Sequence, residues 1–216
     1  MKLTTKQKLV FIGDSITDCG RTQPVGEGLF DPMGRGYVTM VDALINAVYP
    51  HLAIRTANVG TSGHTVRDLE KRWKTDVIDL KPDWLSIMIG TNDVWRQFDT
   101  PKMPEKAVAP DAYEATYDKL LSQTRPLLKG LVLMTPFFVE SHRGDAMRAR
   151  MDEYGAIVKK LAAKHDAIFV DTQTAFDNAL QHQHSAALAW DRVHPNQVGH
   201  MILAKTFLDA INFQWR

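Results

Sequence analysis

The sequence is poor in cysteine and has no long hydrophobic run. Cys19 is the single cysteine among 216 residues, so an intramolecular disulfide and a multi-cysteine metal site are both excluded. A single thiol is typical of a reducing compartment. No stretch approaches the roughly 18–20 apolar residues that cross a bilayer. The apolar run at 9–12 is shorter than the roughly 7–15 residues of a signal-peptide core. These absences predict a soluble, cytoplasmic protein.

The sequence also lacks an excess of either charge. Lys and Arg total 26 and Asp and Glu total 25, for a formal net charge of +1. The charge balance therefore gives no support for a nucleic-acid partner or an anionic membrane partner. Hydrophobic residues make up 44% and charged residues 24%, which excludes disorder and fibrous repeats. The length favours one domain, and we expect it to cover residues 1–216.

Short apolar runs alternate with longer segments of helical period. A parallel sheet with helices on both faces is the fold that this alternation predicts. Ligands of such sheets bind beyond the carboxyl ends of the strands. A proline-rich stretch at 96–110 is expected to be a long loop. The predicted strands are 9–12, 54–59, 84–89, 131–139 and 167–170, and the predicted helices include 36–49, 111–128, 143–165, 174–181 and 194–213.

Four polar clusters stand at the ends of predicted elements. Residues 13–15, 58–63 and 90–93 follow the first three predicted strands, and residues 191–194 lie near the C-terminus, before the last predicted helix. Each cluster alone is typical of ordinary turns, because glycine and asparagine are common there. The predicted topology gathers all four at one rim of the sheet, so together they predict a site.

Together the clusters supply the parts of an acyl-transfer site. Ser15 is a candidate nucleophile that needs a base, and His194 can be that base. Asp191 stands three residues before His194, so one turn of chain can aim its carboxylate at the imidazole. An oxyanion needs hydrogen-bond donors, and the backbone N–H groups of Ser15 and Gly63 and the side-chain amide of Asn92 are suitable.

The same residues resemble the SGNH hydrolases, also called the GDSL esterase/lipase family. Gly-Asp-Ser at 13–15 is similar to the first family block, Asn-x-Gly-x-Ser-Gly at 58–63 to the second, Gly-Thr-Asn-Asp at 90–93 to the third and Asp-x-x-His at 191–194 to the last. The blocks occur in family order over nearly the whole chain. One departure is Ile16, where the family name implies leucine; the side chain stays apolar.

The resemblance implies a three-layer α/β/α, flavodoxin-like fold and an acyl-serine intermediate, with no metal or organic cofactor. It also implies that Asp191 is the acid partner. The stretches VFIGDSITDCGR, IMIGTNDVWRQ and ALAWDRVHP are similar to those of intracellular SGNH esterases that remove acetyl groups from xylo-oligosaccharides. We therefore expect a serine esterase that acts on a small acetylated carbohydrate.

Three other interpretations compete with this one. A lysophospholipase or thioesterase of the same family would act on longer acyl chains, and a carbohydrate-binding protein of the same fold would have no activity. A Rossmann nucleotide-binding module would need Gly-x-Gly-x-x-Gly after the first strand, which is missing. Asp191 and His194 could instead bind a metal, but no third ligand is evident by spacing.

Aromatic residues supply the remaining signal. Trp95 lies three residues after Asn92, and Trp190 directly precedes Asp191. Both are candidate substrate-binding residues, because an indole can stack on a sugar ring; core packing is the alternative for each. The aromatic content and the tail at 213–216 favour a homo-oligomer.

Overall fold

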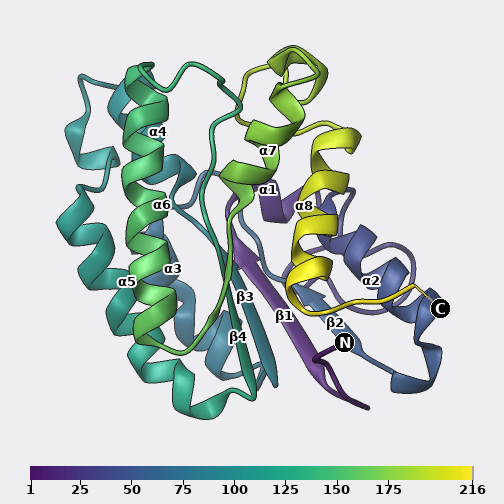
Figure 1. Ribbon diagram of the computed structural model, residues 1–216. Coiled ribbons are helices and arrows are strands. Elements are labelled where there is room, and N and C mark those ends of the chain that lie inside the picture. The colour runs from purple at the N-terminus through teal and green to yellow at the C-terminus, as the bar shows by residue number, and fades with distance from the viewer. Residues whose placement is uncertain (216) are drawn as a thin grey trace.

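A five-stranded parallel sheet forms the centre of the molecule, shown for residues 1–215 of a computed structural model (Figure 1). The strand order β2-β1-β3-β4-β5 places the topological switch between β1 and β3, where ligands of such sheets bind. The predicted parallel sheet is confirmed. Its strands are β1 (Lys8–Gly13), β2 (Arg55–Asn58), β3 (Trp84–Met88), β4 (Gly130–Met134) and β5 (Ile168–Val170).

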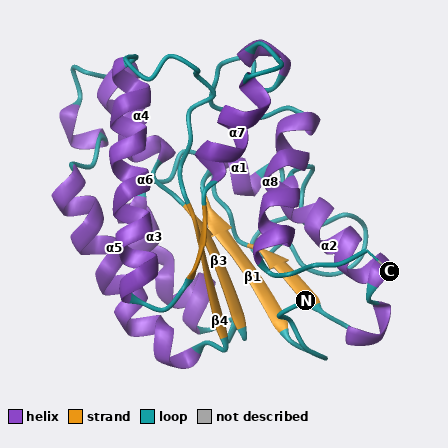
Figure 2. Cartoon of the chain, in the orientation of Figure 1, coloured by secondary structure: helices purple, strands orange, loops and turns teal. Residues whose placement is uncertain are grey.

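Helices cover both faces of this sheet and complete the predicted three layers (Figure 2). The helices are α1 (Ser15–Asp18), α2 (Tyr37–Val48), α3 (Val66–Trp73), α4 (Thr91–Asp99), α5 (Pro110–Thr124), α6 (Ala146–Lys164), α7 (Thr172–Leu180) and α8 (Gln197–Ala210). Short 3-10 or π turns lie at Pro50–Leu52, Lys74–Ile78, Pro104–Lys106, Arg125–Leu127 and Ser185–Ala187. Within residues 1–215, no helix combines the length and the apolarity needed to cross a bilayer.

The strands are buried on both faces because their side chains alternate between two cores. Val10 and Ile12 of β1 pack in the core that contains side chains of α3, α5 and α6. Leu9 and Phe11, the intervening residues, pack in the core that contains side chains of α2, α7 and α8. All four are fully buried. This double burial suits an interior strand, and β1 lies between β2 and β3, so its carboxyl end is at the switch point.

Several predicted boundaries were wrong; the predicted helix 111–128, for example, ends at Thr124 in α5. Prediction extended the fourth strand to residue 139, but β4 ends at Met134, and Pro136 has no N–H with which to continue the ladder. The stretch 96–110 is not one loop, because α4 continues to Asp99 and Pro104–Lys106 forms a 3-10 turn. The last helix begins at Gln197 rather than at residue 194, since the Asn196 side chain caps it.

Candidate active site

Ser15 is the first residue of α1, directly beyond the carboxyl end of β1. Asp14 caps this one-turn helix: its Oδ1 accepts a hydrogen bond from the Ile16 N–H at 3.0 Å. Asp14 therefore supplies the cap, which leaves the Ser15 hydroxyl available for other contacts.

The fold brings Ser15, His194 and Asp191 into one hydrogen-bonded chain. Ser15 Oγ lies 3.0 Å from His194 Nε2, and His194 Nδ1 lies 2.6 Å from Asp191 Oδ2. The other carboxylate oxygen, Oδ1, accepts from the backbone N–H groups of Val193 at 2.9 Å and His194 at 2.7 Å. The carboxylate thus holds both the imidazole and the turn that carries it.

Asp191 is kept in its charged form. Partial burial alone would raise its pKa, but hydrogen bonds from the His194 ring and from the backbone of His194 and Val193 outweigh burial and hold the pKa below 3.8. A carboxylate that accepts several hydrogen bonds stays ionised near neutral pH. Asp191 therefore presents a permanent negative charge to His194 Nδ1, and Nε2 is left to take a proton from Ser15.

The three predicted oxyanion donors lie in the polar segments that follow β1, β2 and β3. Gly63 has a φ of +81°, a left-handed conformation that favours glycine. Within residues 1–215, the backbone N–H groups of Ser15 and Gly63 have no hydrogen-bond acceptor. Asn92, in the first turn of α4, donates one side-chain N–H to the carbonyl of His64 at 3.0 Å. Its second amide hydrogen is available for a ligand.

Arg72 of α3 joins two of the polar clusters, and the sequence had no signal for this. Its guanidinium donates to the Gly13 carbonyl at 2.9 Å, to the Val59 carbonyl at 2.6 Å and to His64 Nδ1 at 3.0 Å. Asp76 neutralises it at 2.6 Å. The turn before Ser15 and the loop that leads to Gly63 are therefore held by one partly buried cation.

Asn58 makes a second connection between these turns. Its Nδ2 donates to the carbonyl of Thr17 at 2.7 Å, and its Oδ1 accepts from the Gly60 N–H at 2.9 Å. The backbones approach so closely that a Cβ on Gly60 would lie 2.3 Å from the Asp18 nitrogen. Gly60 therefore allows the second cluster to pack directly on the nucleophile helix.

Two carboxyl groups are fully buried behind the site. Burial raises the pKa of Asp14 to about 6 and that of Asp93 to about 7, although both accept backbone hydrogen bonds. Asp93 accepts from the Val66 N–H at 3.0 Å, which ties the third cluster to the start of α3. These two carboxyl groups therefore support backbone turns.

The two predicted substrate-binding tryptophans differ in their surroundings. Trp95 is partly buried, and its ring meets the His194 ring edge-on, with a centroid distance of 5.6 Å. Trp190 is 87% exposed and stands beside Asp191 in the chain. Trp95 therefore packs against the predicted base, whereas Trp190 offers a free aromatic face.

A cavity of about 550 Å³ begins at Gly63 and runs between α3 and the segment after α4. Most of its lining side chains are polar or charged: Thr65, Arg67, Asp68, Lys71, Arg96, Glu105 and Lys106. Such a lining suits a hydroxyl-rich ligand better than a long acyl chain.

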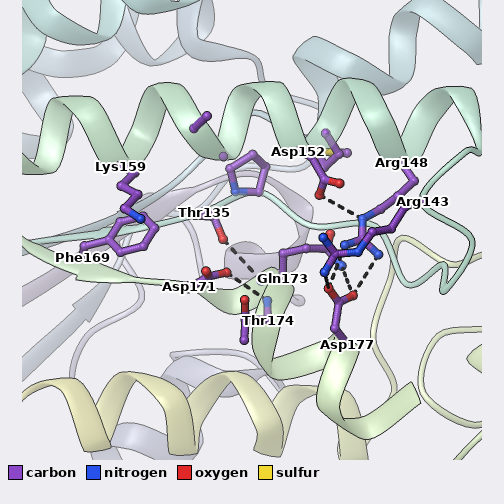
Figure 3. Close-up of a pocket in the computed structure, with 14 residues that line it drawn as sticks. Thr135, Arg143, Arg148, Asp152, Lys159, Phe169, Asp171, Gln173, Thr174 and Asp177 are labelled. Atoms are coloured by element: carbon purple, nitrogen blue, oxygen red, sulfur yellow. Dashed lines mark hydrogen bonds and ion pairs between the residues drawn. The ribbon is translucent and has the colours of Figure 1, made fainter. Parts of the chain in front are cut away.

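A separate cavity of about 250 Å³ lies beyond the ends of β4 and β5, between α6 and α7 (Figure 3). The buried Arg148 lines this cavity and forms ion pairs there. Its Nη1 and Nη2 pair with Asp177 at 2.8 and 2.7 Å, and its Nε pairs with Asp152 at 2.9 Å. Arg148 also donates to the Glu140 carbonyl, and the Glu140 carboxylate binds Arg192 at 2.7 Å. This cluster supports the turn that carries Asp191 and His194.

Comparison with known proteins decides the family. The family model of the GDSL-like lipases and acylhydrolases matches residues 11–202. The chain belongs to this family. It is a hydrolase of carboxylic esters, and the predicted membership and fold are confirmed.

Two relatives match the chain over all or nearly all of its length. An acetylxylan esterase of Geobacillus stearothermophilus is 58% identical over 215 residues, which cover 100% of this chain and 98% of that one. Its crystal structure superposes with a TM-score of 0.98, and variants of it at a serine, an aspartate and a histidine are described as catalytic mutants. An α/β hydrolase from the metagenome of Lake Arreo, Spain, is 51% identical, with a TM-score of 0.97 and coverage of 99% and 98%.

Proposed function

We propose that the protein is a serine esterase that removes acetyl groups from carbohydrate esters, with acetylated xylo-oligosaccharides as its substrates. The observation that carries the proposal is the chain of hydrogen bonds from Ser15 Oγ through His194 to Asp191. A hydroxyl beside a base whose far nitrogen faces a carboxylate is the arrangement that activates a serine nucleophile.

In the first half of the reaction, Ser15 Oγ attacks the acetyl carbonyl carbon and its proton passes to His194 Nε2. The negative charge on the carbonyl oxygen is held by the N–H groups of Ser15 and Gly63 and by the amide of Asn92. The bond between the carbonyl carbon and the sugar oxygen then breaks. His194 returns its proton to that oxygen, and an acetyl-serine remains.

In the second half, water gives a proton to His194 Nε2 as its oxygen attacks the acetyl-serine. The same three donors hold the second oxyanion. Its collapse breaks the bond to Ser15 Oγ, which regains the proton from His194, and acetate leaves. Asp191 keeps its charge throughout and stabilises each imidazolium.

Two observations support a short acyl group on a sugar. The cavity that begins at Gly63 has a mostly polar lining, and the exposed ring of Trp190 can stack on a sugar face. The Geobacillus relative, at 58% identity, is an acetylxylan esterase.

The test is hydrolysis of p-nitrophenyl esters of increasing acyl length, followed by release of acetate from acetylated xylo-oligosaccharides. We expect kcat/KM to fall from acetyl to octanoyl and Ser15→Ala to be inactive on both substrate types. Preference for octanoyl would favour the lysophospholipase or thioesterase interpretation. Activity that survives Ser15→Ala would contradict the proposed mechanism.

The proposal also covers the cellular compartment and the oligomeric state of the enzyme. We place it in the cytoplasm, because its single cysteine suits a reducing compartment. We also propose a homo-oligomer, supported by the exposure of Trp190 at 87% and of Trp215 at 74%, and we expect neither a nucleic acid nor a membrane as partner. Light scattering coupled to gel filtration measures the assembly state, and a monomer at all concentrations would refute the homo-oligomer.

A further inference from the structure

The side-chain amide of Asn92 is held at both ends. Its Nδ2 donates to the His64 carbonyl at 3.0 Å, and its Oδ1 accepts from Arg96 Nη2 at 3.2 Å. A carbonyl oxygen can only accept hydrogen bonds, and a guanidinium can only donate them. Only one of the two possible amide orientations satisfies both neighbours.

The choice of orientation decides whether Asn92 can stabilise an oxyanion. In the observed orientation Nδ2 keeps a second hydrogen for the proposed oxyanion. After a 180° flip, Oδ1 would replace that donor and repel the developing charge. The flip would also place two acceptors and two donors face to face, at His64 and at Arg96. Asn92 is 3% exposed, so bulk water cannot readily relieve those contacts.

Arg96 is itself fixed by three contacts. It follows Asn92 by four positions in α4, so both side chains project from the same side of the helix. Its guanidinium pairs with Asp99 and lies 5.2 Å from the centroid of the Trp95 ring. That ring packs against His194, so Arg96 contacts the amide donor directly and reaches the base only through Trp95.

We propose that Arg96 is a positioning residue that locks the Asn92 amide with its N–H toward the substrate carbonyl. Its positive charge on Oδ1 also polarises the amide and makes Nδ2–H a stronger donor, since charge-assisted hydrogen bonds are stronger than neutral ones. The role rests on the proposed function, because it acts only through an oxyanion at Asn92. Arg96 itself need not touch the substrate.

The test is a double-mutant cycle between positions 96 and 92, with p-nitrophenyl acetate as substrate. We expect Arg96→Met to lower kcat by about tenfold at unchanged KM, less than the roughly 10²–10³-fold loss expected when an oxyanion donor is removed. Arg96→Lys, which keeps a cationic donor, recovers most of that loss. In the Asn92→Ala background Arg96→Met lowers kcat no further, because the amide that Arg96 orients is gone.

Arg150→Met is the matched control, because Arg150 of α6 also pairs with an acidic residue three positions later, Glu153, at 2.6 Å but lies outside the proposed site, and it leaves kcat unchanged. Should Arg96→Met fail to fold, as judged by thermal unfolding, Arg96→Leu, which also lacks a donor, replaces it in the same cycle. An equal loss of kcat with and without Asn92 would overturn the proposal, as would full activity of Arg96→Met. Failure of the proposed function is seen separately, as activity that survives Ser15→Ala.

Discussion

His194 Nε2 lies 3.0 Å from Ser15 Oγ, although 179 positions separate the two residues in the sequence. Ser15 follows the interior strand β1, and His194 lies in the turn before α8. The parallel sheet brings these distant turns to one rim, because all its strands end on the same side. The hydrogen bond between the two side chains is therefore a product of the whole topology.

Loss of either side chain should abolish turnover. We expect Ser15→Ala and His194→Ala each to lower kcat/KM on p-nitrophenyl acetate by about 10⁴-fold or more, and the double variant to lose little beyond either single one, since the groups act as a unit. Ser122→Ala and His51→Ala, at exposed positions, serve as controls with full activity. Additive losses in the double variant would show that the two groups do not act together.

Gly60 and Gly155 should respond in opposite directions to the same substitution. A Cβ at Gly60 would lie 2.3 Å from the Asp18 nitrogen, whereas one at Gly155, inside α6, would only reach ordinary contact with Thr135 at 3.7 Å. We expect Gly60→Ala to lower the free energy of unfolding by about 1–3 kcal/mol. Gly155→Ala should raise it by roughly 0.5–1 kcal/mol. Urea titration measures both, and equal effects would contradict the close approach at Gly60.

Removal of Arg72 should damage both stability and catalysis. Arg72→Met leaves the Val59 carbonyl without its donor, at a cost of about 1–3 kcal/mol for a buried acceptor, and the Gly13 carbonyl keeps only the Thr61 N–H. We also expect kcat to fall more than KM rises, because the turns before Ser15 and Gly63 lose their common anchor. Lys74→Met, whose side chain is 79% exposed, should change neither quantity. An Arg72→Met enzyme with native stability would disprove the anchoring role.

The buried carboxyl of Asp93 should make the protein less stable as the pH rises. Burial raises its pKa from 3.8 to about 7, so between about pH 4 and pH 7 the unfolded chain releases a proton that the folded chain retains. The folded state then binds more protons, and the free energy of unfolding falls with increasing pH. Below that window both states are protonated and the effect vanishes.

Asp93→Asn tests this dependence by chemical denaturation at pH 5 and pH 8. The variant cannot ionise, so its stability should fall less than that of the wild type between the two pH values. Asp166→Asn, at a side chain that is 97% exposed, should retain the wild-type difference. If Asp93→Asn and the wild type lose the same stability, the buried carboxyl is not the source of the pH dependence.

The sequence predicted those features of the fold and the site that depend on local patterns. Alternating apolar runs located all five strands, and the polar residues directly after them predicted where Ser15 and Asn92 lie. The spacing of Asp191 and His194 also predicted their contact, because three positions suffice to bring a carboxylate to an imidazole within one turn.

The predictions failed where backbone hydrogen bonding sets the end of a strand, or where tertiary contacts set the role of a side chain. Pro136 marked the end of β4, yet the apolar residues up to 139 suggested a longer strand; those side chains are buried off the sheet. Arg72 looks like any arginine on an amphipathic helix, and three of its acceptors come from segments outside its own helix. The same holds for Arg96, whose contact with Asn92 depends on the orientation of one amide.

The most direct test of the central claim is mass spectrometry of the enzyme after treatment with a p-nitrophenyl alkylphosphonate, which reacts with activated serine hydroxyls. We predict one phosphonyl group per chain, on the peptide that contains Ser15, and a rate of labelling that drops by orders of magnitude in His194→Ala. A label on another residue, or equally fast labelling of Ser15 without His194, would contradict activation of the serine by the histidine.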